Sequence, residues 1–339
     1  MNGPVGAPVA YYRGAHVSAA STATPIRRPR RLADRAGDLL LSGLTGAAAL
    51  GAIALVLAIA WKIVDGSRLA FSKFGLGFVT SRVWDPVTSH FGALDFLFGT
   101  LYTTALAILI AGPLAIAIGL FLSELAPRGI RGGLGALVEM LAAIPSVVLG
   151  LWGILVLGPF LHRTLDPALK HGLGFLPFFR GDIPQSGVGL MPAVIVLTIM
   201  SVPIIASISR ELFLAVPPEL EEGALALGAT RWEMVRGVVL PATRAGLAAA
   251  VILGMGRALG EAIAVTQVIG GQTGIHLSLF ETGDTLASRI AAQYQGAVSN
   301  VQVSSLVYLA AILLAITLIA NLAAQMIVRR FEFQRTGAD

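Results

Sequence analysis

Long apolar runs separated by short polar segments fill most of this chain. Six of the runs reach the roughly 20 apolar residues that an α-helix needs to cross a lipid bilayer. They cover Leu39–Val64, Phe96–Leu122, Leu134–Phe160, Val188–Ile208, Gly246–Ile269 and Val303–Val328. The pattern predicts an all-α, polytopic membrane protein with six transmembrane helices. Pro145 and Pro203 remove backbone hydrogen bonds inside the third and fourth runs, so we expect those helices to face protein or a cavity rather than lipid.

The same runs predict how the chain is divided. Residues 1–36, rich in Ala, Ser, Thr, Pro and Arg, are expected to form a disordered cytoplasmic tail, and residues 37–94 the first transmembrane helix with an outer loop. Residues 95–331 are expected to form the core, which includes a long cytoplasmic loop at 211–243, and residues 332–339 a short C-terminal tail.

The composition agrees with a membrane protein. Of the 339 residues, 55% are hydrophobic and 13% are charged, whereas soluble domains hold about 25% charged residues. There is no cysteine, which excludes disulfides, thiolate metal sites and cysteine nucleophiles. The five histidines are scattered over the tail and the predicted outer loops. No cluster in the apolar runs therefore has the spacing of a metal site or an enzyme active site.

The basic residues predict the orientation of the helices. They gather at 27–35, 128–131, 210–244 and 329–335, while the other loops carry fewer of them and several aspartates. Such basic loops beside membrane spans normally lie in the cytoplasm, which places both termini there. The net charge of +5 is not gathered in one stripe, so it does not indicate nucleic-acid binding.

The long cytoplasmic loop has the pattern of two short helices. Pro217 and Pro218 suit the start of a helix, and three glutamates follow in its first turn, where the helix dipole favours negative charge. Gly228 is expected to end this helix. The stretch RWEMVRGVVLP then predicts an amphipathic helix that Pro241 stops.

This loop resembles the coupling loop of ABC importer permeases, whose signature is Glu-Ala-Ala, three residues, Gly, nine residues and Ile-x-Leu-Pro. The matching positions are Glu222, Gly223, Ala224, Gly228, Val238, Leu240 and Pro241. Gly223 and Val238 depart from the signature by small changes. The resemblance implies the type I importer permease fold and a loop that docks on a separate ATPase subunit. The alternative is an ordinary pair of surface helices.

The sequence contains no P-loop. This phosphate-binding motif requires Gly-Lys followed by Ser or Thr, and none of Lys62, Lys73 and Lys170 follows a glycine. We therefore expect a transport subunit rather than an enzyme, with no cofactor of its own. ATP and Mg²⁺ are expected on a partner chain.

Two charges interrupt the fifth apolar run, in GRALGEAIAV. Arg257 and Glu261 are four residues apart, so on a helix they share one face and reach each other. Ionisable residues within a membrane normally face a bundle interior or a watery cavity and mark a substrate route. Glu139, in the third run, is a further candidate for that route. The alternative is a purely structural clip between Arg257 and Glu261.

The segments LGMGRALGEAIAVTQVIGG, LAAIPSVVLGLWG and LGFLPFFRG are similar to the phosphate-specific ABC importer permeases of the PstC type. The resemblance runs from about Asp95 to the C-terminus. It implies a protein of the bacterial inner membrane in which Arg257 and Glu261 take part in phosphate passage. It also implies three partners: a homologous PstA-like permease, a dimer of PstB-like ATPase subunits and an external PstS-like phosphate-binding protein.

Other functions stay open at this point. An ABC importer for sulfate or molybdate would carry the same coupling loop. A carrier or channel driven by an ion gradient would need no ATPase. A second copy of this chain could replace the PstA-like permease.

Overall fold

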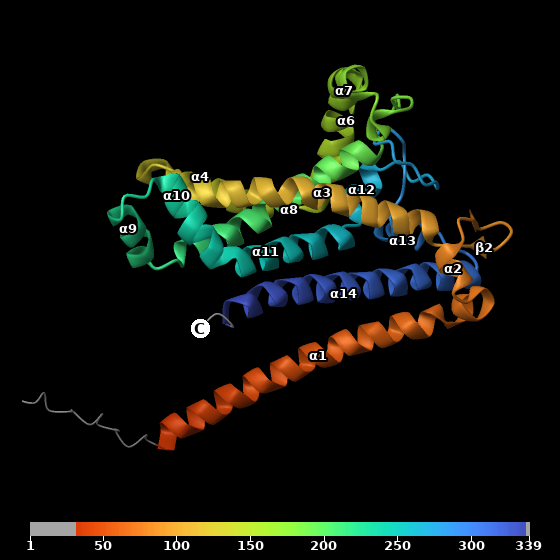
Figure 1. Ribbon diagram of the computed structural model, residues 1–339. Coiled ribbons are helices and arrows are strands. Elements are labelled where there is room, and N and C mark those ends of the chain that lie inside the picture. Colours follow the sequence, from red (N-terminus) through yellow and green to blue (C-terminus); the bar gives the residue numbers. More distant parts are fainter. Residues whose placement is uncertain (1–31, 337–339) are drawn as a thin grey trace, which may run out of the picture. The chain divides into compact units, whose positions relative to one another are not determined.

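The computed structural model describes residues 32–336 (Figure 1). The chain divides into two compact units, Met1–Leu57 and Ala58–Asp339. The first unit contains the beginning of helix α1, and the second contains the rest of α1 and all other elements. Most of the predicted N-terminal tail lies outside the described residues. Helix α1 begins at Leu32, before the boundary predicted at residue 37.

Helices make up most of the described structure. The α-helices are α1 (Leu32–Phe74), α2 (Gly77–Thr80), α3 (Leu94–Leu120), α4 (Arg128–Ala142), α5 (Ser146–Trp152), α6 (Gly158–Phe160), α7 (Asp166–Leu173), α8 (Leu190–Leu214), α9 (Pro218–Ala226), α10 (Arg231–Met234), α11 (Leu240–Gly260), α12 (Ile263–Val268), α13 (Leu286–Gln293) and α14 (Asn300–Thr336). The π-helical turns are η1 (Phe121–Leu125), η2 (Gly153–Leu157), η3 (Leu161–Leu165) and η5 (Val235–Val239), and η4 (Pro177–Phe179) is a 3-10 turn. The strands β1 (Trp84–Asp85) and β2 (His90–Phe91) form a small antiparallel pair.

Six helices of the described chain are long and apolar enough to cross a membrane, as the sequence predicted. They are Leu39–Phe74, Leu94–Leu125, Ser146–Leu173, Leu190–Leu214, Arg231–Gly260 and Asn300–Met326. The predicted all-α, six-helix architecture is therefore confirmed. The last helix, α14, continues to Thr336, past the start of the tail predicted at residue 332.

The third span differs from its prediction. The run Leu134–Phe160 is interrupted at Pro145, which separates α4 from α5. A proline disfavours helical backbone in the residue before it, and Pro145 itself leaves the helical conformation, with φ −59° and ψ 137°. The third span is therefore Ser146–Leu173, and α4 is a separate amphipathic helix packed on α8. Pro203, by contrast, lies inside the continuous helix α8.

The fifth span differs at both ends. The prediction that Pro241 stops a helix is wrong, because one continuous helix runs over Arg231–Gly260 and Pro241 lies directly after its π-helical turn η5. A π turn has a wider hydrogen-bond spacing, which relieves the crowding between a proline ring and the carbonyl one turn earlier. At the far end the helix stops at Gly260 and the short α12 follows, so the predicted span Gly246–Ile269 is not a single helix.

Helices α3 and α8 form the centre of the second unit. Four small buried residues recur at every fourth position of α3: Ala107, Ala111, Ala115 and Gly119. A Cβ on Gly119 would lie 2.9 Å from the Cβ of Ser209 and 3.1 Å from the carbonyl oxygen of Ala206. Small residues let membrane helices approach this closely, so this face of α3 fixes its contact with α8.

A second core lies at the end of this unit away from α9 and α10, where α13, α14 and the β-strands meet (Figure 1). The Nε atom of Arg289 lies 2.7 Å from a carboxylate oxygen of Asp284, and both side chains are buried. The guanidinium also lies 4.7 Å from the ring centre of Phe96 and donates a hydrogen bond to the carbonyl of Gly271 at 2.9 Å. Arg289 thus ties α13 to Asp284 and Gly271 in the loop after α12 and to Phe96 of α3.

We expect Arg289→Leu to lower the free energy of unfolding by about 3–5 kcal/mol, because it leaves the Asp284 carboxylate buried without its counter-ion. The double variant Arg289→Leu/Asp284→Asn removes both charges and should recover much of that loss. Thermal unfolding of the detergent-purified protein measures both effects. A single variant as stable as the wild type would show that the pair does not hold this end together.

Candidate functional site

Arg257 and Glu261 stand at the end of α11. Arg257 lies in the last turn, and the helix ends at Gly260, so the backbone of Glu261 is extended, with φ −71° and ψ 116°. The side chains meet nevertheless, since Nη2 of Arg257 lies 3.7 Å from Oε2 of Glu261. The predicted proximity of the two charges is confirmed. The end of the helix, rather than a shared helical face, directs Glu261.

A second contact holds the Glu261 side chain. Its Oε1 accepts a hydrogen bond from the backbone N–H of Ala264 at 3.2 Å, in the first turn of α12, where N–H groups lack helical partners. The Glu261 side chain is 8% exposed and that of Arg257 41%. At 3.7 Å the ion pair is too long to be a hydrogen bond. Within the described part of the chain, Arg257 therefore keeps its N–H donors for a ligand.

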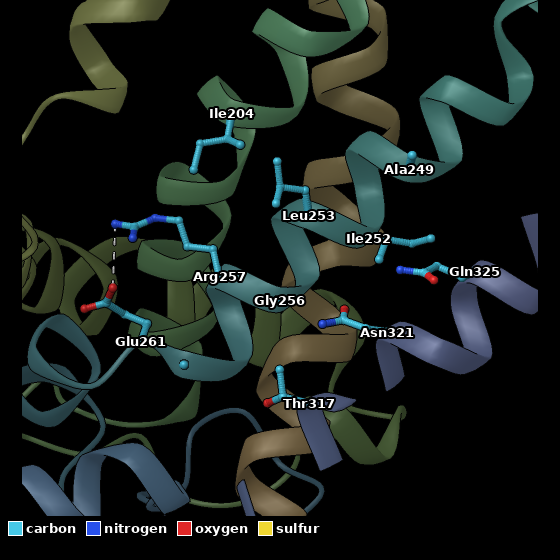
Figure 2. A pocket seen from close by; sticks show the side chains of 11 residues that line it. Ile204, Ala249, Ile252, Leu253, Gly256, Arg257, Glu261, Thr317, Asn321 and Gln325 are labelled. Carbon is cyan, nitrogen blue, oxygen red and sulfur yellow. Dashed lines mark ion pairs between the residues drawn. The ribbon is translucent and has the colours of Figure 1, made fainter. Parts of the chain in front are cut away.

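Both side chains line a cavity of about 810 Å³ formed by α8, α11 and α14. Its apolar wall includes Ile204 of α8 and Leu253 of α11. Figure 2 shows the guanidinium of Arg257 turned toward Glu261 on one side, and α14 on the other. The partial exposure of Arg257 means that the cavity opens to the surface of this chain. The site thus combines one cation, a nearby carboxylate and apolar walls.

Helix α14 contributes three polar side chains that the sequence analysis did not single out. Thr317, Asn321 and Gln325 recur every four residues, so they lie on one face of the helix, and all three line the cavity. The sequence did contain a signal, because polar side chains at helical spacing within an apolar run are unfavourable against lipid. It did not show which neighbour this face meets.

Glu139 lies away from this cavity. It belongs to α4, its side chain is 64% exposed, and its Oε1 lies 3.6 Å from Nη1 of Arg210 on α8. The break at Pro145 is the reason, because it removes α4 from the third span. The structure brings together two of the three predicted pathway residues and separates Glu139 from them.

Of the two short helices predicted between α8 and α11, the first is present as α9, whereas the second, α10, is the beginning of the continuous helix Arg231–Gly260. Gly228 follows the first helix in left-handed conformation, with φ +87°. Its N–H donates to the carbonyl of Leu225 at 3.0 Å, and the N–H of Ala229 donates to the carbonyl of Ala224 at 3.2 Å. These two bonds form a Schellman motif, the helix ending that favours glycine. Thr230 then begins α10 with a capping box.

This helix pair has a packed side and an exposed side. Ala224 and Leu240 pack against a buried cluster that includes Phe213 of α8 and extends to the end of α3. Glu222 and Gly223 are exposed. The packed side of the pair therefore contacts the ends of α3 and α8.

Apolar side chains stand on the exposed side of the pair. Leu227 is 91% exposed and Trp232 65%, and exposed apolar patches mark interaction surfaces. Burial raises the pKa of the nearby Glu221, and the carboxylates of Glu124 and Glu222 raise it further. A partner that covers the apolar residues and brings basic groups would relieve this repulsion.

Among the residues whose side chains the structure describes, no three His, Cys, Asp or Glu are grouped so that they could hold a metal ion. The predicted location of ATP and Mg²⁺ on a partner chain stays a prediction.

Comparison with known proteins agrees with these features. Residues 115–333 match the family described as binding-protein-dependent transport system inner membrane component. Among solved structures, the chain is similar to a bacterial ABC transporter involved in the import of the acidic polysaccharide alginate, with a TM-score of 0.58 and 20% identity over 86% of this chain and 98% of that one. This likeness confirms the ABC importer permease fold.

Two curated relatives cover nearly the whole chain. The sequence is 44% identical to the phosphate transport system permease protein PstC of Mesorhizobium japonicum, over 89% of this chain and 92% of the relative. It is 41% identical to the PstC protein of Haemophilus influenzae, over 87% of this chain and 94% of the relative. With the six spans, the α9–α10 helix pair and the charged cavity, these similarities show that the chain belongs to the PstC family of ABC importer permeases.

Proposed function

We propose that this chain is the transmembrane permease subunit of an ATP-driven phosphate importer of the bacterial inner membrane, with both termini in the cytoplasm. The observation that carries the proposal is the Arg257–Glu261 pair lining a cavity between membrane-spanning helices. A guanidinium with available donors between apolar walls suits an anion with several oxygens. The phosphate transport names of the PstC relatives give the substrate.

The geometry suits passage rather than tight binding. Phosphate carries one to two negative charges, and the planar N–H donors of Arg257 match its oxygens in pairs. Glu261, 3.7 Å away, partly neutralises the cation and so keeps it from trapping the anion. Its carboxylate can also accept a hydrogen bond from the P–OH group of monoprotonated phosphate. A conducting site needs such weak and transient binding.

The coupling surface and the charged cavity belong to one helix. The continuous helix Arg231–Gly260 contains α10, the π turn η5 and α11, so it links the exposed Trp232 to Arg257 over about 40 Å. A dimer of PstB-like ATPase subunits docks on the exposed side of α9 and α10. Its closure on ATP moves this helix and changes access to Arg257.

Two further partners complete the transporter. A homologous PstA-like permease packs beside this chain and closes the open side of the cavity, where Arg257 is 41% exposed. A PstS-like phosphate-binding protein delivers substrate at the end of the bundle away from the coupling helices.

Uptake of labelled phosphate tests the proposed function. Cells that lack the gene should regain uptake when this chain is restored, and an excess of sulfate or molybdate should not compete. Uptake should also disappear when the partner ATPase is inactivated. Failure to restore phosphate uptake would remove the substrate assignment. Competition by sulfate or molybdate would indicate another oxyanion, and uptake without the ATPase would indicate a carrier driven by an ion gradient.

A further inference from the structure

Three side chains of α14 are polar, although they lie in a membrane-spanning part of the helix where apolar side chains are expected. Thr317, Asn321 and Gln325 lie within the apolar span Asn300–Met326 and face the cavity that contains Arg257. Among the described residues, none of the three side chains forms a hydrogen bond, even though a hydroxyl or carboxamide in an apolar environment is unfavourable without a partner. In the transporter their partners are therefore water, a ligand in the cavity, or the second permease that the proposed function places at its open side.

The three residues extend away from Arg257 in one direction. Figure 2 shows Asn321 next to Gly256 and Gln325 next to Ile252, which lies one turn nearer the coupling helices along α11. A Cβ built on Gly256 would lie 3.7 Å from the Asn321 carboxamide oxygen, an ordinary van der Waals contact, so the two residues are neighbours. From Thr317 to Gln325 the polar line covers about 12 Å of helix. Thr317 is at the end of this line nearer Arg257 and Glu261, and Gln325 is at the end nearer α9 and α10.

We propose that Thr317, Asn321 and Gln325 form a line of neutral hydrogen-bonding groups along which phosphate leaves Arg257 toward the coupling-helix end of the bundle. This inference rests on the proposed function and assigns three further residues to the same path. A carboxamide donates N–H bonds to P–O⁻ oxygens and accepts a bond from P–OH, so it suits every protonation state of phosphate near neutral pH. A neutral group also releases the anion more easily than a second arginine would.

A packing role accounts less well for these residues. A side chain that only fills space between membrane helices gains nothing from an unpaired carboxamide, and leucine would serve better. Polar side chains that join membrane helices do so through hydrogen bonds between the helices, which these three do not form within the described chain. Apolar replacements should therefore leave insertion and folding intact.

The experiment measures phosphate uptake by Asn321→Leu, Gln325→Leu and the double variant in cells that lack the wild-type gene. Leucine is close in size to asparagine and glutamine and removes only the hydrogen-bonding groups. We expect the double variant to import phosphate about tenfold more slowly, because two hydrogen bonds to the moving anion are lost. Asn321→Gln, which keeps a carboxamide, should retain most of the rate. The phosphate concentration for half-maximal uptake should stay unchanged, since the external binding protein sets it.

A transposed variant provides the matched control. Asn321→Leu/Leu322→Asn keeps the composition but moves the carboxamide to Leu322, which does not line the cavity. Its uptake should stay as low as that of Asn321→Leu, and recovery would overturn the inference. Equal losses of membrane-inserted protein in Asn321→Leu and Asn321→Gln, seen by blotting, would also overturn it by assigning a packing role.

Two reference strains separate this inference from the proposed function. If the wild type imports phosphate and Arg257→Ala does not, but the double leucine variant imports like the wild type, only the line on α14 is wrong. If the wild type itself restores no phosphate uptake, the proposed function fails and this inference fails with it.

Discussion

Arg257→Ala is expected to lower phosphate uptake roughly 100-fold while the transporter remains in the membrane. The variant loses paired, charge-assisted hydrogen bonds to the anion, each of which contributes about 1.5–3 kcal/mol. No other cation lines the cavity in the described structure. Arg257→Lys should also be impaired, because an ammonium is a point charge without the planar pair of donors. Labelled-phosphate uptake, normalised to membrane levels by blotting, measures both variants.

A control is needed because Arg257→Ala also leaves the nearly buried carboxylate of Glu261 without its counter-ion, which by itself destabilises a protein. The double variant Arg257→Ala/Glu261→Gln removes both charges and should keep normal membrane levels. It should still fail to import phosphate if Arg257 acts in passage. Uptake at the wild-type rate in both Arg257→Ala and Arg257→Lys would instead mean that the pair is a structural clip and that phosphate takes another route.

Gly228→Arg is expected to abolish uptake by separating the permease from its ATPase. Gly228 has φ +87°, a conformation that costs a non-glycine residue about 1–2 kcal/mol, so the Schellman ending of α9 is disturbed. The added arginine side chain is expected to reduce ATPase binding more than this change in the backbone does. No atom lies within 4 Å of a Cβ built on Gly228, so the arginine projects from the exposed side of the helix pair, where the ATPase is proposed to dock. Co-purification of a tagged ATPase subunit, together with phosphate uptake, measures this loss.

Two matched variants distinguish the effect of the left-handed backbone from the effect of the added side chain. Gly228→Asn tolerates the left-handed conformation and adds a small side chain, so it should keep most of the uptake. Gly223→Ala restores the alanine of the importer signature at an exposed position with free space around it, and should behave like the wild type. Normal ATPase binding and uptake in Gly228→Arg would show that this surface is not where the ATPase docks.

Features set by neighbouring residues could be predicted from the sequence. The six spans follow from the length of the apolar runs, because a helix satisfies its own backbone hydrogen bonds in lipid. The ending of α9 at Gly228 follows from the freedom of glycine to adopt positive φ. The contact between Arg257 and Glu261 follows from their spacing of four residues and survives the end of the helix at Gly260.

The three prolines show that residues close together in sequence do not decide whether a helix breaks. Pro145 lies in the break between α4 and α5 as the N-cap of α5, Pro203 lies inside α8, and Pro241 lies inside a continuous helix after a π turn. The residue type is the same in all three places, and each removes one backbone donor. Whether the helix breaks or continues depends on the packing around it. The misplacement of Glu139 in a span follows directly from this uncertainty at Pro145.

Residues close together in the chain are enough to predict the membrane class, the number of spans, the ending of α9 and one charged pair, because each of these depends on a local pattern. That α14 places Asn321 beside Gly256, and that Arg289 of α13 reaches Phe96 of α3, depends on the tertiary structure. These contacts join segments far apart in sequence. Each face of a helix carries its own pattern of polar and apolar groups, but the pattern does not specify its partner. Close packing of whole helices selects that partner, and with it the lining of the cavity.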